Sequence, residues 1–208
     1  IVDVCGNPTQ WNVAVQAQKI LQDGGVKYSL SPGNHDYEGL TGLTADQKVP
    51  RSLATYNSYF KKADYDAWLG NENFGTYDDT MDNSWHKFEV DGYKYMIIAL
   101  EFGPRDGVIA WANNLCASNP DYNVIITTHA YMYRDGTTLD ISDVCPPSKD
   151  GDNIVYDKTS INNGDDMWNK VFSKHKNVLM VISGHDPWQH IVYRQDKGVN
   201  GNTVTQFL

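Results

Sequence analysis

Cysteine is scarce in this sequence. Three cysteines among 208 residues cannot supply a disulfide framework, and a chain of this length buries roughly 70% of its unfolded surface without one. No Cys-x-x-Cys spacing points to zinc or redox chemistry. Cys116 lies on the apolar face of a predicted helix and is expected to be buried. Cys5 and Cys145 lie in predicted loops and would pair only in an oxidising compartment.

Positive charge and long apolar runs are also in short supply. Lys and Arg total 17 against 26 Asp and Glu, giving a net charge of -9. This balance argues against an extended nucleic-acid or anionic-membrane partner and leaves room for a local basic pocket. No apolar run approaches the roughly 20 residues of a membrane span. The chain starts with Ile1, and its first residues resemble neither a signal peptide nor a start at an initiator methionine. We therefore expect the natural amino terminus to lie upstream.

The remaining composition is that of a folded chain. Hydrophobic residues make up 40% and aromatic residues 12%, too much for a disordered protein. Length and the lack of linkers or repeats predict one domain over residues 1–208, incomplete at both ends. The richness in Tyr, Trp, Asn and Gly favours a secreted or periplasmic protein.

Hydrophobic periodicity predicts an α/β (α+β) fold. Asp91-Gly92 separates two strand patterns and is the strongest hairpin signal in the chain. Residues 37–83 are expected to be a largely irregular excursion over the sheet edge. Helices are predicted after Pro8, over 53–62, over 108–116 and over 167–175, and strands over 1–4, 26–30, 85–90, 93–100, 123–128, 178–182 and 203–208.

Polar residues follow three of the predicted strands directly. These are Asn34-His35-Asp36, His129 and His185. The carboxyl ends of strands are where open α/β sheets place their chemistry. A single histidine after a strand is more often a hydrogen-bonded surface residue than a ligand. The joint placement favours a metal site, because a hydrolytic metal centre needs nitrogen and oxygen ligands from separate rigid elements.

These motifs resemble the calcineurin-like metallophosphoesterase superfamily. The likeness runs from the strand and helix at the start, through Gly33-Asn34-His35-Asp36 and the hairpin, to His129 and Gly184-His185. It implies a four-layer sandwich of two mixed β-sheets flanked by helices. It also implies a dinuclear centre of divalent ions (Mn, Fe, Zn or Ni) at the carboxyl ends of the strands.

The resemblance implies roles for individual residues. Asn34, His129 and His185 would bind the second metal, and His35 would be the catalytic histidine beside the phosphoester. Ile1-Val2-Asp3 resembles the end of the family's Gly-Asp-x-x-Asp block. Asp3 would then pair with His35 and favour its protonated form.

The sequence departs from the family pattern at two places. The bridging Asp would lie immediately before Ile1 and the Asp-x-His block further upstream, so two ligands of the first metal and the bridging ligand are missing. In the Gly-His-x-His ending Pro187 replaces the second histidine, which leaves His190 as a substitute ligand or as a solvent-facing side chain. This chain is therefore expected to bind one metal or none and to be inactive or nearly so.

Several nearby residues have more than one interpretation. Tyr131 and Arg134 are candidate substrate contacts, Arg134 because its donor fork suits a phosphate, although loop packing explains both equally well. Asp36 is expected to accept loop N–H groups rather than bind metal. His86 and His175 are interpreted as structural.

The leading hypothesis is metal-dependent hydrolysis of a phosphomonoester or phosphodiester by a metal-activated water, with a small phosphorylated substrate. One alternative is a non-catalytic ligand-binding or interaction domain on the same fold. Another is a hydrolase that uses a single metal. Exposed sheet edges would allow a homo-oligomer.

Overall fold

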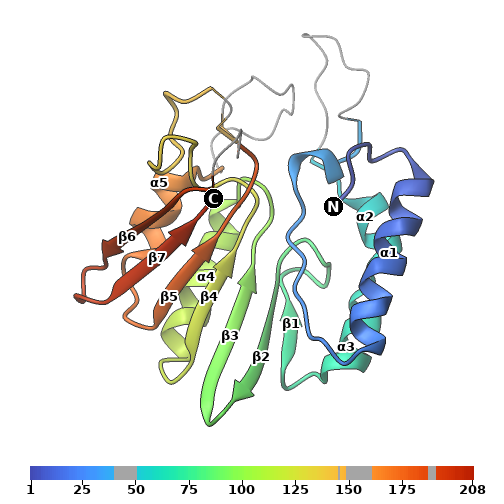
Figure 1. Ribbon diagram of the computed structural model, residues 1–208, viewed down its shortest axis with the longest axis horizontal. Coiled ribbons are helices and arrows are strands. Elements are labelled where there is room, and N and C mark those ends of the chain that lie inside the picture. The colour runs from blue at the N-terminus through green and yellow to red at the C-terminus, as the bar shows by residue number, and fades with distance from the viewer. Residues whose placement is uncertain (40–50, 145, 149–160, 187–190) are drawn as a thin grey trace.

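A seven-stranded mixed sheet forms the centre of the computed structural model, which describes residues 1–39, 51–144, 146–148, 161–186 and 191–208 (Figure 1). The strand order is β1-β2-β3-β4-β5-β7-β6. Strands β3, β4, β5 and β7 run parallel to one another, whereas β1, β2 and β6 pair antiparallel. The strands are β1 (Phe74–Thr76), β2 (Ser84–Val90), β3 (Tyr93–Ala99), β4 (Asn123–Thr127), β5 (Val178–Ile182), β6 (Tyr193–Lys197) and β7 (Thr203–Phe207). The predicted α/β class is confirmed.

The predicted hairpin is confirmed at β2 and β3. Val90 pairs with Tyr93 across the turn. Asp91 and Gly92 both have positive φ angles, of 50° and 80°, as the two-residue hairpin turn requires. This hairpin joins the antiparallel part of the sheet to its parallel centre.

One face of the sheet is covered by the helices of the carboxyl-terminal half (Figure 1). Helix α4 (Asp106–Ser118) buries Val108, Ala112 and Cys116 in the same cluster as the strand residues Ile98 and Ile126. Burial of Cys116 was expected. Helix α5 (Gly164–Met167) continues into one π-helical turn, η3 (Trp168–Phe172), where a single helix was predicted.

A second, aromatic core lies beside the β1 side of the sheet. It is formed by α1 (Pro8–Asp23), α2 (Ala54–Tyr59) and α3 (Lys62–Leu69). Trp11 is fully buried, stacks on Tyr59 at 5.4 Å and donates to the carbonyl of Cys5. The expectation of an irregular excursion over 37–83 is wrong for the described part of this stretch, because its aromatic residues fold into two helices, one strand and this core.

Two predicted strands are not formed. Residues 1–4 and 26–30 have no strand partner, and the described residues contain one sheet rather than two. Close to the start of the chain, side chains take the place of a neighbouring strand: Val2 N–H donates to Asp36 Oδ1, and Val4 N–H donates to Gln10 Oε1. These backbone donors are therefore satisfied without a ladder.

The open edges of the sheet are short or charged. Strand β1 has three residues, and β6 carries Arg194, Asp196 and Lys197, features that disfavour edge-to-edge pairing. Within the described ranges, no helix has the length and apolar character needed to cross a membrane.

Candidate metal site

The carboxyl ends of β4 and β5 bring two histidines together. His129 follows β4 by two residues and His185 follows β5 by three. The backbone of the two tips is joined directly, because Gly184 N–H donates to the carbonyl of His129 at 2.9 Å. Their imidazole rings lie 5.1 Å apart, centroid to centroid. Two of the three predicted strand ends are therefore confirmed, whereas the third is wrong because residues 26–30 form no strand.

The Gly33-Asn34-His35-Asp36 segment packs against this pair as a single 3-10 turn, η1 (Asn34–Asp36). Asn34 is buried, and its Oδ1 lies 3.0 Å from Nε2 of His129. A Cβ atom at Gly33 would lie 3.0 Å from that same nitrogen. Glycine at position 33 therefore allows the imidazole to approach the turn closely.

Burial keeps His129 neutral. It lowers the pKa of His129 to about 3, with smaller contributions from His185, the amino terminus and His35. The neutral imidazole is the form that binds a metal.

His185 has an unusual backbone conformation. Its φ is 79°, in the left-handed region that few non-glycine residues adopt. Phe102 packs against both imidazoles, with ring centroids 5.9 Å from His129 and 5.2 Å from His185. A non-glycine residue held in this region is a feature that clusters at functional sites.

His35 lies next to Asn34, and its imidazole ring is oriented by Asp3. Its Nδ1 is 2.7 Å from the backbone carbonyl of Asp3 and 3.6 Å from the Asp3 carboxylate. A carbonyl accepts but does not donate, so Nδ1 carries the hydrogen and Nε2 is the free end of the ring. The predicted pairing of Asp3 with His35 is present, with the main-chain oxygen as the nearer partner.

Asp36 performs the role expected of it. Its carboxylate accepts from the backbone N–H groups of Val2 and Gly33, at 2.9 Å and 2.7 Å. These contacts hold the η1 turn, and with it Asn34, in place. The two histidines interpreted as structural also have local partners, His86 with Ser29 and His175 with Asn113.

The structure places the candidate substrate residues differently. Tyr131 is fully buried, packs on Phe172 and donates to Gln206, so it faces the core and not a substrate. Its prediction as a substrate contact is corrected. Arg134 makes a bidentate ion pair with Asp186 at 2.6 and 2.7 Å. His190 and Cys145 lie outside the described residues.

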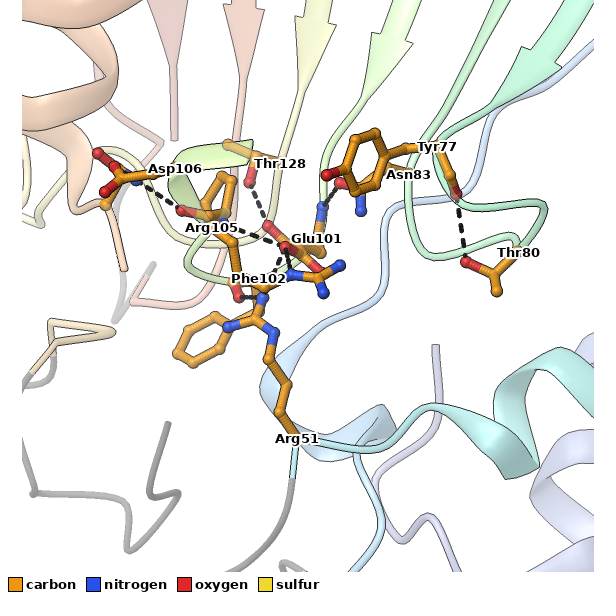
Figure 2. Close-up of polar contacts among 11 residues, drawn as sticks. Arg51, Tyr77, Thr80, Asn83, Glu101, Phe102, Arg105, Asp106 and Thr128 are labelled. Atoms are coloured by element: carbon orange, nitrogen blue, oxygen red, sulfur yellow. Dashed lines mark hydrogen bonds and ion pairs between the residues drawn. The ribbon is translucent and has the colours of Figure 1, made fainter. Parts of the chain in front are cut away.

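A buried ionic cluster that the sequence patterns do not indicate is centred on Glu101 (Figure 2). Glu101 follows β3, is 1% exposed, and accepts from Arg105 Nε at 2.9 Å while Arg51 Nη2 lies 3.1 Å away. The same Arg51 nitrogen donates to the carbonyl of Phe102 at 2.6 Å, and Thr128, which precedes His129, donates to the carbonyl of Glu101. The available signal was a carboxylate directly after a buried strand.

Asn34, His129 and His185 offer one amide oxygen and two imidazoles, which are donor types that a divalent cation accepts. His129 Nε2 and Asn34 Oδ1 lie 3.0 Å apart, at hydrogen-bond distance, so Nε2 would have to lose its hydrogen before both atoms could bind one ion. Imidazole and amide oxygen suit Mn, Fe, Zn or Ni. The described part of the chain contains no group of three or more His, Cys, Asp or Glu side chains placed to hold a metal. A metal site formed by these residues would therefore depend on the Asn34 amide.

Comparison with known proteins identifies one distant relative. No family model and no solved structure matches the chain. Over 191 residues it is 26% identical to YvnB of Bacillus subtilis strain 168, an uncharacterized protein. The match covers 89% of this chain and 12% of that protein, so the chain spans a small part of its relative's length.

Proposed function

We propose that this chain is the metal-binding core of a calcineurin-like metal-dependent phosphoesterase, which hydrolyses a small phosphomonoester or phosphodiester. The observation that carries the proposal is that Asn34, in the η1 turn, and His185, after β5, each lie beside His129, with His35 next to Asn34. Three separate elements supply these side chains, as a rigid metal centre requires. The proposal includes the four-layer sandwich, of which the described residues form one mixed sheet and its helices.

The roles follow from the donor atoms. Asn34, His129 and His185 would hold one divalent ion. When bound, such ions polarise phosphoryl oxygens and provide a hydroxide at neutral pH. A second ion would need carboxylate ligands beyond those that this chain brings to the site, because two adjacent cations repel each other strongly without them.

His35 would act on the substrate directly. Its side chain is 48% exposed, and the contact of Nδ1 with the Asp3 carbonyl leaves Nε2 directed away from Asp3. In the protonated form, Nε2–H can donate to a phosphoryl oxygen or to the leaving oxygen.

Hydrolysis of bis(p-nitrophenyl) phosphate and p-nitrophenyl phosphate tests this function. With Mn²⁺ and enzyme at high concentration, we expect slow turnover above the enzyme-free rate. His35→Gln should lower that turnover at least tenfold while metal binding persists. His175→Gln, a change of the same chemistry outside the site, should leave it unchanged. Equal turnover by the wild type and His35→Gln would contradict the role of His35.

A non-catalytic binding domain is the second candidate. The observation that favours it is the dependence of the site on an amide, without three His or acidic ligands among the described residues. This candidate predicts metal binding with no turnover of either substrate, in this chain and in a version extended upstream.

A further inference from the structure

A polar pocket of about 240 Å³ lies at the opposite end of the sheet from the histidines. Strands β2 and β3 and the residue before β4 form it, near the β2–β3 turn, whereas His129 and His185 follow the carboxyl ends of β4 and β5 (Figure 1). Its principal lining residues are Lys27, Asn73, Lys87, Glu89, Lys94 and Tyr122. The two sites are therefore separated by the length of the strands.

Three lysines converge on this pocket without carboxylate partners. Lys27, Lys87 and Lys94 form no ion pair within the described part of the chain. Other lysines do, since Lys19 pairs with Asp23 and Lys62 pairs with Asp66. In a protein of net charge -9, acidic partners are plentiful. Three lysines that line one pocket and form no ion pair are therefore a local reversal of the charge of the molecule.

Two of these ammonium groups face the same aromatic ring. Lys87 Nζ lies 4.6 Å and Lys94 Nζ 5.8 Å from the centroid of the Tyr122 ring. A cation over a ring is favourable, but two like charges at one ring repel each other. Glu89 pairs with Lys94 in the strand register, so one carboxylate also faces the pocket and offsets part of the positive charge. The lining keeps an excess of two positive charges.

We propose that this pocket binds a small anion of the phosphate type, carrying two negative charges. The charge of such an anion matches the excess of the lining and relieves the repulsion between Lys87 and Lys94. Lysine ammonium groups bind phosphate as point charges. Asn73 and Tyr122, which also line the pocket, carry neutral donors, and the Asn73 amide already donates one hydrogen to Glu72 Oε1 at 3.2 Å. This site lies apart from the proposed metal centre and does not depend on it.

Titration of the full chain with inorganic phosphate tests the proposal. Amide NMR shifts are recorded at each phosphate concentration, at low ionic strength and in the presence of a chelator. We expect saturable shifts at residues 87–94 and 122–123. Lys87→Gln should weaken binding about fivefold, the effect of removing one unit charge near an exposed anion. Glu89→Gln should tighten binding by a similar factor. A destabilised variant would not gain affinity, so the opposite signs separate electrostatics from folding.

Matched controls complete the test. Lys197→Gln removes the same charge from β6 at the other edge of the sheet and should leave binding unchanged. His129→Ala should also leave it unchanged, which makes failure of this proposal distinguishable from failure of the metal site. Shifts that grow linearly with phosphate, or equal losses in the Lys87 and Lys197 variants, would overturn the proposal. Loss of binding in His129→Ala would assign the phosphate to the metal centre instead.

Discussion

The two hydrophobic cores of this molecule are built from different materials. The core against the sheet is mostly aliphatic and includes Ile98, Val124, Ile126 and Val181 from adjacent strands. The amino-terminal core is much richer in aromatic side chains and packs helices against irregular segments. Strand positions are fixed by hydrogen-bond register, whereas the aromatic core depends on side-chain packing over short helices. The candidate metal site would draw its ligands from both regions.

The contrast explains how the site is held. His129 and His185 follow strands of the first core, and Asn34 follows a segment that the second core supports. Asp36 joins this segment to residue 2. Loss of packing in the first core should therefore displace the two histidines, whereas loss of packing in the second core should displace Asn34.

Trp11→Ala is expected to have the largest effect. It removes a fully buried ring and its bond to Cys5, which should lower the free energy of unfolding by about 3–5 kcal/mol. Urea denaturation followed by circular dichroism measures this. Val13→Ala on the exposed face of α1 should change it by less than about 0.5 kcal/mol.

Hydrogen exchange on the same variant sharpens the comparison. If the two cores unfold separately, amides of residues 28–37 lose protection while those of β4 keep it. Equal loss in both regions would show that the cores form one cooperative unit.

Glu101→Gln comes next. Arg51 and Arg105 would lose their shared carboxylate in a buried setting, which should destabilise the fold by about 3 kcal/mol. Asp23→Asn, which breaks an exposed pair on α1, should cost no more than about 0.5 kcal/mol. Thermal denaturation of both variants measures the two losses of stability. Similar small losses in the two variants would mean that the Glu101 cluster does not stabilise the fold.

The aromatic side of the molecule also predicts a pH dependence. Burial lowers the pKa of His86 to about 4, below the value of about 6.5 in an unfolded chain. The unfolded state therefore takes up this proton first as pH falls, and stability decreases between about pH 6.5 and pH 4, by up to about 1.4 kcal/mol per pH unit. His86→Gln should reduce that slope in urea denaturation at a series of pH values. An unchanged slope would exclude His86 as its source.

Gly33→Ala should have the smallest effect on stability, about 1 kcal/mol. The new methyl group would meet Nε2 of His129 at 3.0 Å and move it away from Asn34, so zinc affinity in calorimetry should fall. Gly6→Ala is the control, because a Cβ there has no neighbour within 4 Å. Equal zinc affinity in both variants would contradict the close approach of His129 to the turn.

Local patterns predicted the sheet better than they predicted the second core. Asp91-Gly92 and the apolar runs before His129 and His185 are short-range signals, and each gave the correct element. Residues 1–4 look like a strand, but their N–H groups bond to side chains of Gln10 and Asp36. The pairing of Glu101 with Arg51 joins residues 50 positions apart, and no local pattern indicates it. Tyr131 is close to His129 in the sequence, which suggested a place near the site. Chain position alone does not show which way its side chain turns.

Metal stoichiometry tests the central claim most directly. The purified chain is loaded with Zn²⁺ or Mn²⁺, passed through gel filtration and measured by elemental mass spectrometry, beside Asn34→Ala, His129→Ala and His175→Gln. We predict one metal per chain in the wild type and His175→Gln, and a marked loss in Asn34→Ala and His129→Ala. No retained metal in the wild type, or equal metal in all four proteins, would contradict a metal site formed by Asn34, His129 and His185.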